Sequence, residues 1–159
     1  PNAYEGAKAL ANGEVTRAHY ARYLVQIGKV SNDGQAFKRY LGGGKSCFVK
    51  AEWVDIPTAI DTIHAAGGVA VIAHPMRYNM TGKWIRRLIV DFKQWGGDGM
   101  EVSDSGQTKD QRQYLARLAN EYDLAASLGS DFHFPCGWIE LGKNLFLPEE
   151  VKPIWTLFE

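Results

Sequence analysis

The sequence has few cysteines, no net charge and no long apolar run, and each absence argues against a class of protein. Only two of its 159 residues are cysteine, and they form no C-x-x-C pair, so neither a disulfide framework nor a zinc knuckle is expected. Eighteen basic residues balance eighteen acidic ones, so the net charge gives no sign of a nucleic-acid or membrane partner. No apolar run reaches the roughly 18 residues of a membrane-spanning helix. These absences favour a globular protein in a reducing, cytoplasmic setting.

The residues that are present divide the chain into two parts. Apolar residues make up 45% of the sequence, which is enough to fill a core. Residues 1–52 predict a small helical unit, because Thr16 can cap a helix that stops at Gly28 and a second helix stops at the glycines of 42–44. Residues 53–159 alternate between helix and strand patterns. We therefore expect a helical unit at 1–52 and a second unit of mixed structure at 53–159.

The pattern of the second part predicts a parallel sheet. Apolar runs indicate four strands, at 69–73, 99–103, 125–130 and 143–148. Helices are predicted between them, with a cap at Asp55, an apolar stripe at Trp84, Ile85, Leu88, Ile89 and Phe92, and a capping box at Thr108 and Gln111. Strands separated by helices of this length imply a parallel sheet covered on both faces, and hence the α/β class.

Two of the predicted strands end in residue types that ligate metals. The run VAVIAHP at 69–75 stops at His74, and AASLGSDFH at 125–133 stops at Asp131 and His133. Reactive groups of parallel α/β folds collect just past the carboxyl ends of the strands, and imidazole with carboxylate suits zinc, manganese or iron. The alternatives are a hydrogen-bonded structural histidine and an aspartate in a turn. Only the conjunction of the three side chains favours a metal site.

Other polar residues carry weaker signals. His19 and Arg22 are three residues apart on a predicted helix and share a face, with Arg17 near its start, an arrangement that suits a phosphate group. A solvated helical face explains the same spacing. Arg77, in HPMRYN, lies next to the proposed metal site. Glu101 could be a metal ligand, a base or the partner of a nearby arginine, and we favour the last.

Four segments occur together and in order: TRAHYARYLV, AHPMRYN, GMEVS and GSDFH. Together they resemble the C-terminal part of the polymerase and histidinol phosphatase (PHP) family of metal-dependent phosphoesterases. The resemblance covers nearly the whole chain, including residues 1–52, which in the most similar branch form an insertion that caps the active site. It implies part of a distorted (β/α)7 barrel with up to three divalent cations at the carboxyl ends of its strands, Mn²⁺ foremost and Zn²⁺, Fe²⁺ or Mg²⁺ as alternatives.

The resemblance also implies roles for individual residues. Three match metal ligands of the family: His74, Asp131 and His133. Asp131 would in addition hold and orient a metal-bridging hydroxide that attacks phosphorus. The T-R-x-H-x-x-R helix would face the substrate, so that His19 and Arg22 contact a phosphate group, with Arg77 nearby.

The activity implied by the resemblance is hydrolysis of phosphate esters in 3′,5′-nucleoside bisphosphates or at the 5′ ends of short RNA, the latter as a 5′-to-3′ exoribonuclease. The first motifs of the family, an H-x-H strand and a T-D-H-D-like turn, are absent here. We therefore expect this chain alone to be inactive or nearly so. The alternative is a non-catalytic nucleotide- or RNA-binding module on a barrel remnant. Neither a membrane nor a protein partner is predicted.

Overall fold

The chain folds as two compact units, Pro1–Trp53 and Val54–Glu159, which are described separately here. The structure is a computed structural model that describes residues 2–133, 135 and 139–158, so Cys136 lies outside the described ranges. Cys47 is an exposed free thiol in the first unit. Within the described ranges, each helix is too short or too polar to cross a bilayer.

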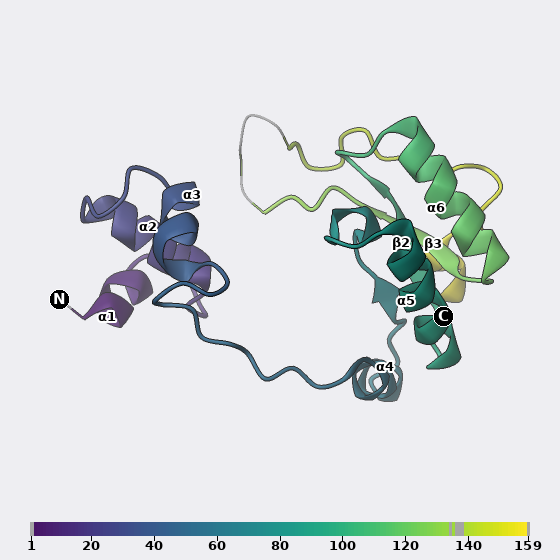
Figure 1. The fold of residues 1–159 in the computed structure, drawn as a ribbon, viewed down its shortest axis with the longest axis horizontal. Helices are drawn as coiled ribbons and strands as arrows, with labels where there is room; N and C mark the ends of the chain where they lie inside the picture. The colour runs from purple at the N-terminus through teal and green to yellow at the C-terminus, as the bar shows by residue number, and fades with distance from the viewer. Residues whose placement is uncertain (1, 134, 136–138, 159) are drawn as a thin grey trace. The chain divides into compact units, whose positions relative to one another are not determined.

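The first unit is helical (Figure 1). Its elements are α1 (Ala3–Lys8), α2 (Arg17–Gln26), α3 (Asp33–Ala36) and a wider π-type turn, η1 (Phe37–Leu41). Thr16 begins α2 through a capping box, and Gly28, at a left-handed φ of 71°, follows its end. A small core of buried side chains holds the helices together: Ala21, Val30, Ala36 and Leu41.

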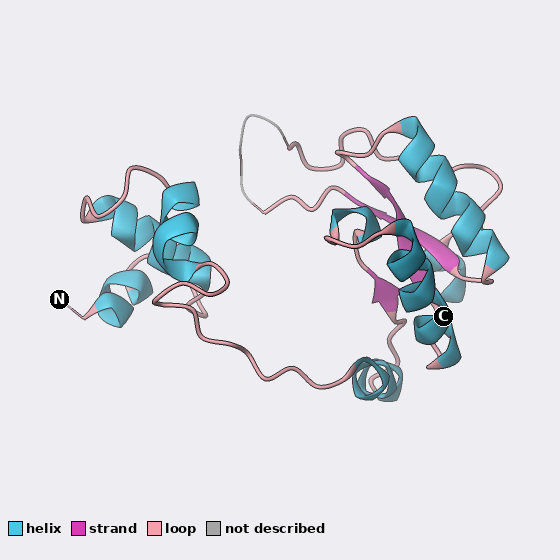
Figure 2. Cartoon of the chain, viewed as in Figure 1, coloured by secondary structure: helices cyan, strands magenta, loops and turns pink. Residues whose placement is uncertain are grey.

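The second unit is built on a parallel sheet, which Figure 2 shows with helices packed around it. The strands lie in the order β1 (Val71–Ile72), β2 (Gly99–Asp104) and β3 (Ala125–Gly129). The helices are α4 (Ile56–Ala65), α5 (Gly82–Gln94) and α6 (Lys109–Glu121), with short 3₁₀ turns η2 (Pro75–Arg77) and η3 (Ile154–Leu157). The α/β class is confirmed, with three strands formed by the described residues.

The predicted strand at 143–148 is wrong. Side chains of neighbouring elements hold this segment instead, because Phe146 N–H donates to Ser103 Oγ at 3.4 Å and Arg112 donates to the carbonyl of Asn144 at 3.3 Å. A later residue, Pro153, pairs with the edge of β3 through an isolated parallel bridge to Ala126.

One face of α5 enters the core of the second unit. Ile85, Ile89 and Phe92 are buried, and Leu88 packs against them at the margin. Trp84, which the sequence pattern placed in the same stripe, is 62% exposed and lies outside the core. The core is completed by apolar residues of the sheet and of α6, among them Ile72, Met100, Val102, Leu115 and Leu118.

Gly99 is packed closely against the backbone of the neighbouring strand β3. A Cβ there would lie 2.6 Å from Ile154 Cδ1 and 2.7 Å from the backbone oxygen of Ala125. We expect Gly99→Ala to lower the free energy of unfolding by about 2 kcal/mol, because the clash is with the neighbouring strand. Urea denaturation measures this. Gly106→Ala is the control, since its Cβ would meet Asp104 Oδ1 at an ordinary 3.5 Å, and equal losses for both variants would contradict the packing argument.

Candidate active site at the carboxyl ends of the strands

His74 lies just past the end of β1 in a left-handed backbone conformation, with φ 31° and ψ 56°. A residue with a Cβ pays about 1–2 kcal/mol for this conformation, so neighbouring groups must hold it. The backbone N–H of His74 donates to Glu101 Oε2 at 2.9 Å, and its carbonyl accepts from Arg77 N–H at 2.9 Å. Tyr78 contacts the imidazole edge-on at a ring distance of 5.8 Å. The imidazole is thereby fixed at the rim of the sheet.

Arg77 connects the ends of β2 and β3. Its Nε and Nη2 donate to the two carboxylate oxygens of Asp104 at 2.6 and 2.7 Å, and its Nη1 donates to Asp131. Asp104 is only 2% exposed and also accepts from Gly106 N–H at 2.8 Å. Asp131, like His74, has a positive φ, here 54°. One guanidinium therefore joins two carboxylates that come from neighbouring strands.

An extra residue in β2 brings Glu101 and Asp104 to the same side. In a regular strand residues three apart point to opposite faces. The pairing of β2 with β3 shifts register between Glu101 and Ser103, so that Glu101 stands opposite Ser127 and Asp104 opposite Gly129. Ser127 and Gly129 are two residues apart and share a face, and the bulge thus places both carboxyl groups on one side of the sheet.

The surroundings raise the pKa of Glu101 and lower the pKa of Asp104. Burial raises the pKa of Glu101, and the hydrogen bond from His74 N–H only partly offsets this. Burial alone would also raise the pKa of Asp104, but hydrogen bonds from Arg77 and Gly106 outweigh it and the net pKa lies below its ordinary value. The hydrogen bond to Asp104 in turn raises the pKa of Arg77. The Arg77–Asp104 pair is therefore charged on both sides at neutral pH.

Three buried polar atoms lack a hydrogen-bond partner among the described residues: Nδ1 of His74, Oε1 of Glu101 and Nε2 of Gln107. Orphaned buried atoms of this kind call for a ligand, a water or an ion. An imidazole nitrogen and a carboxylate oxygen are donor types that transition-metal cations accept. The residues thus fit a divalent cation as part of a ligand set.

The structure brings some of the predicted ligands together and not others. His74 and Asp131 lie at one rim, joined through Arg77. His133 is 72% exposed, and its Nδ1 donates to the carbonyl of Asp131 at 2.8 Å. Within the part of the chain that the structure describes, no group of three or more His, Cys, Asp or Glu side chains is gathered closely enough to hold a metal. The ligand assignment stays a prediction.

The predicted phosphate contacts His19 and Arg22 belong to α2 in the first unit. Nδ1 of His19 accepts the backbone N–H of Thr16 at 3.0 Å, so this ring also caps its own helix. Arg22 is exposed on the same helix. Their contact with a substrate stays a prediction as well.

The expected pairing of Glu101 with a nearby arginine is wrong for the described residues, and Asp104 was not among the predicted site residues. Glu101 accepts from a backbone N–H, whereas the nearby guanidinium of Arg77 pairs with Asp104 and Asp131. Asp104 follows a predicted strand directly, which is the signal that pointed to His74 and Asp131. Strand alternation counts against it, because without the bulge Asp104 would face away from Glu101.

Comparisons with solved structures define the class of protein. No family model matches the chain. An amidohydrolase from Chromobacterium violaceum, solved with bound sulfate and no metal, has a TM-score of 0.82 and 38% identity and covers 98% of this chain and 55% of its own. A protein named as a metal-dependent phosphoesterase, from Bifidobacterium adolescentis, has a TM-score of 0.73 and 27% identity over 98% of this chain and 56% of its own. The chain has the fold of part of a phosphoesterase or amidohydrolase.

Curated relatives narrow the class to particular hydrolases. The chain is 81% identical over 158 residues to the 5′-3′ exoribonuclease of Haemophilus influenzae and 51% identical over 160 residues to the 5′-3′ exoribonuclease Rnm of Escherichia coli. It is 41% identical over 146 residues, 91% of its length, to the 3′,5′-nucleoside bisphosphate phosphatase of Chromobacterium violaceum. The resemblance inferred from the sequence motifs is confirmed.

The match extends over nearly all of this chain but over little more than half of each relative. The Haemophilus and Escherichia comparisons cover 99% and 100% of this chain, yet 58% and 55% of the relatives. The phosphatase from Chromobacterium is covered over 51% of its length.

The ion pair between buried Asp104 and part-exposed Arg77 makes a testable contribution to stability. We expect Asp104→Asn to lower the free energy of unfolding at pH 7 by about 2 kcal/mol, less than a fully buried pair would lose, because water screens the part-exposed Arg77. The pKa of Asp104 is lowered by folding, so its contribution is complete above its ordinary pKa of 3.8 and disappears as the pH falls through the lower folded value. Denaturant titrations from pH 7 to pH 3 measure both effects.

Asp91→Asn is the matched control for this prediction. Asp91 pairs with Arg87, which is 67% exposed, so we expect a loss below about 0.5 kcal/mol. Equal losses for the two aspartates at pH 7 would contradict the special role of Asp104.

Proposed function

We propose that this chain is part of a divalent-metal phosphoesterase that hydrolyses 3′,5′-nucleoside bisphosphates or removes nucleotides from the 5′ ends of short RNA. The observation that carries the proposal is the rim cluster, in which His74 and Asp131 lie at strand ends around Arg77. Nδ1 of His74 and Oε1 of Glu101 are buried there without a hydrogen-bond partner among the described residues. The names of the curated relatives support the same chemistry and the same two substrate classes.

In this proposal His74, Asp131 and His133 contribute ligands to a divalent cation, with Mn²⁺ favoured and Zn²⁺, Fe²⁺ or Mg²⁺ as alternatives. Such a cation supplies activation of water as a nucleophile and neutralisation of charge on the phosphoryl oxygens. Asp131 accepts a hydrogen bond from the attacking water and orients it toward phosphorus. Glu101 fixes the backbone of His74, and Asp104 fixes the guanidinium of Arg77.

Residues 1–52 form, in this proposal, a helical insertion that supplies a second phosphate contact. His19 and Arg22 would hold a phosphate group that does not react. Arg77 is a further candidate phosphate contact, in the second unit. Binding energy from such a group positions the reacting ester. Because the chain matches only part of each relative, we propose that it is inactive alone and that the reaction belongs to the full-length protein, in the cytoplasm.

One observation favours a second candidate, a nucleotide- or RNA-binding module without catalysis. The described residues gather no group of three metal-ligating side chains, so this chain by itself offers an incomplete metal site. Metal analysis of the purified full-length protein separates the two. Retention of a divalent cation through gel filtration supports the enzyme, and RNA binding without any bound cation supports the module.

If the proposed function is correct, hydrolysis by the full-length protein depends on His74 and Asp131. The full-length protein with Mn²⁺ should release phosphate from 3′,5′-bisphosphates or mononucleotides from 5′-phosphorylated RNA. We expect His74→Ala and Asp131→Asn each to lower kcat/KM by about 10²-fold or more, because each removes a group at the reacting phosphate. Asp123→Asn, a substitution of a 95% exposed side chain, is the control. Release of neither product by the wild type would refute the proposal.

The second phosphate contact predicts a change in KM. Arg22→Ala should raise KM for a 3′,5′-bisphosphate by roughly 10-fold with little change in kcat, because the lost contact holds substrate and transition state alike. Initial rates over a range of substrate concentrations measure both constants. Arg39→Ala, also an exposed arginine of the first unit, is the control. A fall in kcat without a rise in KM would contradict a positioning contact.

A further inference from the structure

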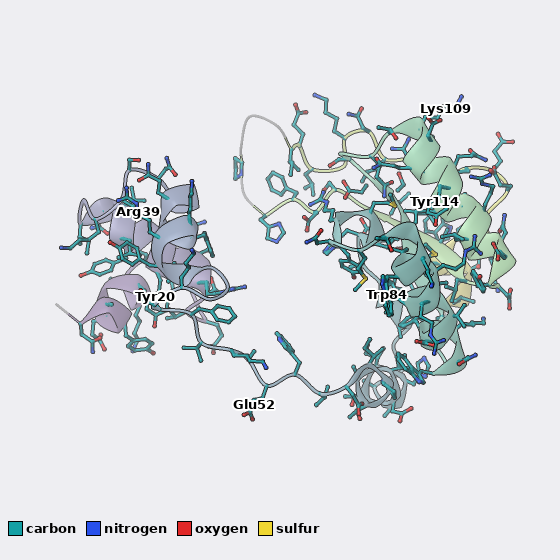
Figure 3. All side chains as sticks on the ribbon, viewed as in Figure 1. Tyr20, Arg39, Glu52, Trp84, Lys109 and Tyr114 are labelled. Atoms are coloured by element: carbon teal, nitrogen blue, oxygen red, sulfur yellow. The ribbon has the colours of Figure 1, made fainter. Side chains whose placement is uncertain are left out.

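The outer face of α5 carries a hollow that the proposed chemistry does not use. Lys83, Trp84, Arg87 and Asp91 line it, and its volume is about 440 Å³. We call these four residues the α5 groove. Trp84, labelled in Figure 3, is 62% exposed and takes no part in the core, which α5 enters through Ile85, Ile89 and Phe92. The indole is therefore free to contact a ligand.

The groove begins beside the candidate active site. In a parallel α/β unit the helix that follows a strand starts at the carboxyl end of that strand. The chain leaves β1 through His74 and η2, and α5 starts soon afterwards at Gly82. Lys83 and Trp84 thus stand in the first turn of α5, on the rim that carries His74 and Arg77. The groove continues from there along the helix to Asp91.

The charges of the groove favour an anionic ligand at its rim end. Lys83 has no ion pair or hydrogen bond with another described residue through its side chain. Arg87 is 67% exposed and donates its Nε to Asp91 at 2.9 Å. The groove combines a free ammonium group, an exposed guanidinium and the face of an indole. Proteins bind single-stranded nucleic acid with this combination of cations for phosphates and aromatic rings for bases.

We propose that the α5 groove binds single-stranded RNA on the 3′ side of the nucleotide that is removed. A base stacks on the indole of Trp84, and Lys83 and Arg87 contact the flanking phosphates. The proposal rests on the proposed function and extends it, because it gives a longer RNA a contact that a single nucleotide at the strand ends does not make. RNA length would then decide how much the groove contributes to binding.

Direct binding tests the groove without hydrolysis. The 159-residue protein is titrated into 5′-phosphorylated oligoribonucleotides labelled at the 3′ end, in EDTA, and fluorescence anisotropy is followed. We expect Trp84→Ala to weaken binding of an octanucleotide by roughly 5- to 100-fold, and Trp84→Phe to restore part of it. Trp95→Ala, which changes a 40% exposed indole at the other end of α5, should leave the affinity unchanged.

Two further variants test the electrostatic part. Lys83→Gln should make the slope of log K against log salt shallower by about 0.7, the value for one phosphate contact with a single strand. Asp91→Asn should tighten binding, because it removes a negative charge and releases Arg87. Unchanged salt slopes with Lys83→Gln, or weaker binding with Asp91→Asn, would overturn the assignment of the phosphate path.

Kinetics of the full-length protein separate this inference from the proposed function. We expect the rise in KM caused by Trp84→Ala to grow with RNA length, from a dinucleotide to an octanucleotide. Hydrolysis with equal KM changes at all lengths would overturn the groove and leave the enzyme intact. A wild type that hydrolyses nothing would overturn the enzyme, and the binding titrations would still decide on the groove. Trp84-dependent self-association in light scattering, with unchanged RNA affinity, would assign the face to a second copy instead.

Discussion

The guanidinium of Arg77 is the group on which the rim of the second unit depends. Carboxyl groups from β2 and from the segment after β3 converge at this edge, and without a cation among them their mutual repulsion would push the loops apart. Arg77 donates to both Asp104 and Asp131, and its own backbone N–H holds the carbonyl of His74. Arg77, which itself follows β1, thereby links the end of β2 to the segment after β3. The catalytic proposal requires the same edge to stay in place.

Features that follow a regular period could be predicted from the sequence. The Thr108–Gln111 capping box opens α6 as expected, and two of the predicted parallel strands fall within a residue of β2 and β3. The periodic pattern of α5 also identified its buried residues, but it could not tell that Trp84 stands at the margin of the stripe. A helical period gives the direction of a side chain, whereas burial depends on what the rest of the fold places opposite.

Features that depend on an irregular backbone could not be predicted. Asp104 joins the site only because β2 carries one extra residue, and alternation in the sequence indicates the opposite face. The positive φ values of His74 and Asp131 likewise depend on partners far along the chain. The segment at 143–148 has the composition of a strand, yet Ser103 and Arg112 satisfy its backbone through side chains. In each case a long-range contact overrides a local preference.

The cap at the start of α2 limits what His19 can offer to a ligand. Because Nδ1 accepts the backbone N–H of Thr16, the neutral ring must carry its hydrogen on Nε2. His19 is thus held in a single tautomer and orientation. Its Nε2–H is available as a hydrogen-bond donor, and its Nδ1 acceptor is already used by Thr16. An anion could accept from the Nε2–H, while a metal ion would find the Nδ1 lone pair occupied by the N–H of Thr16. The ring is suited to donating a hydrogen bond to an anion and poorly placed to bind a metal through Nδ1.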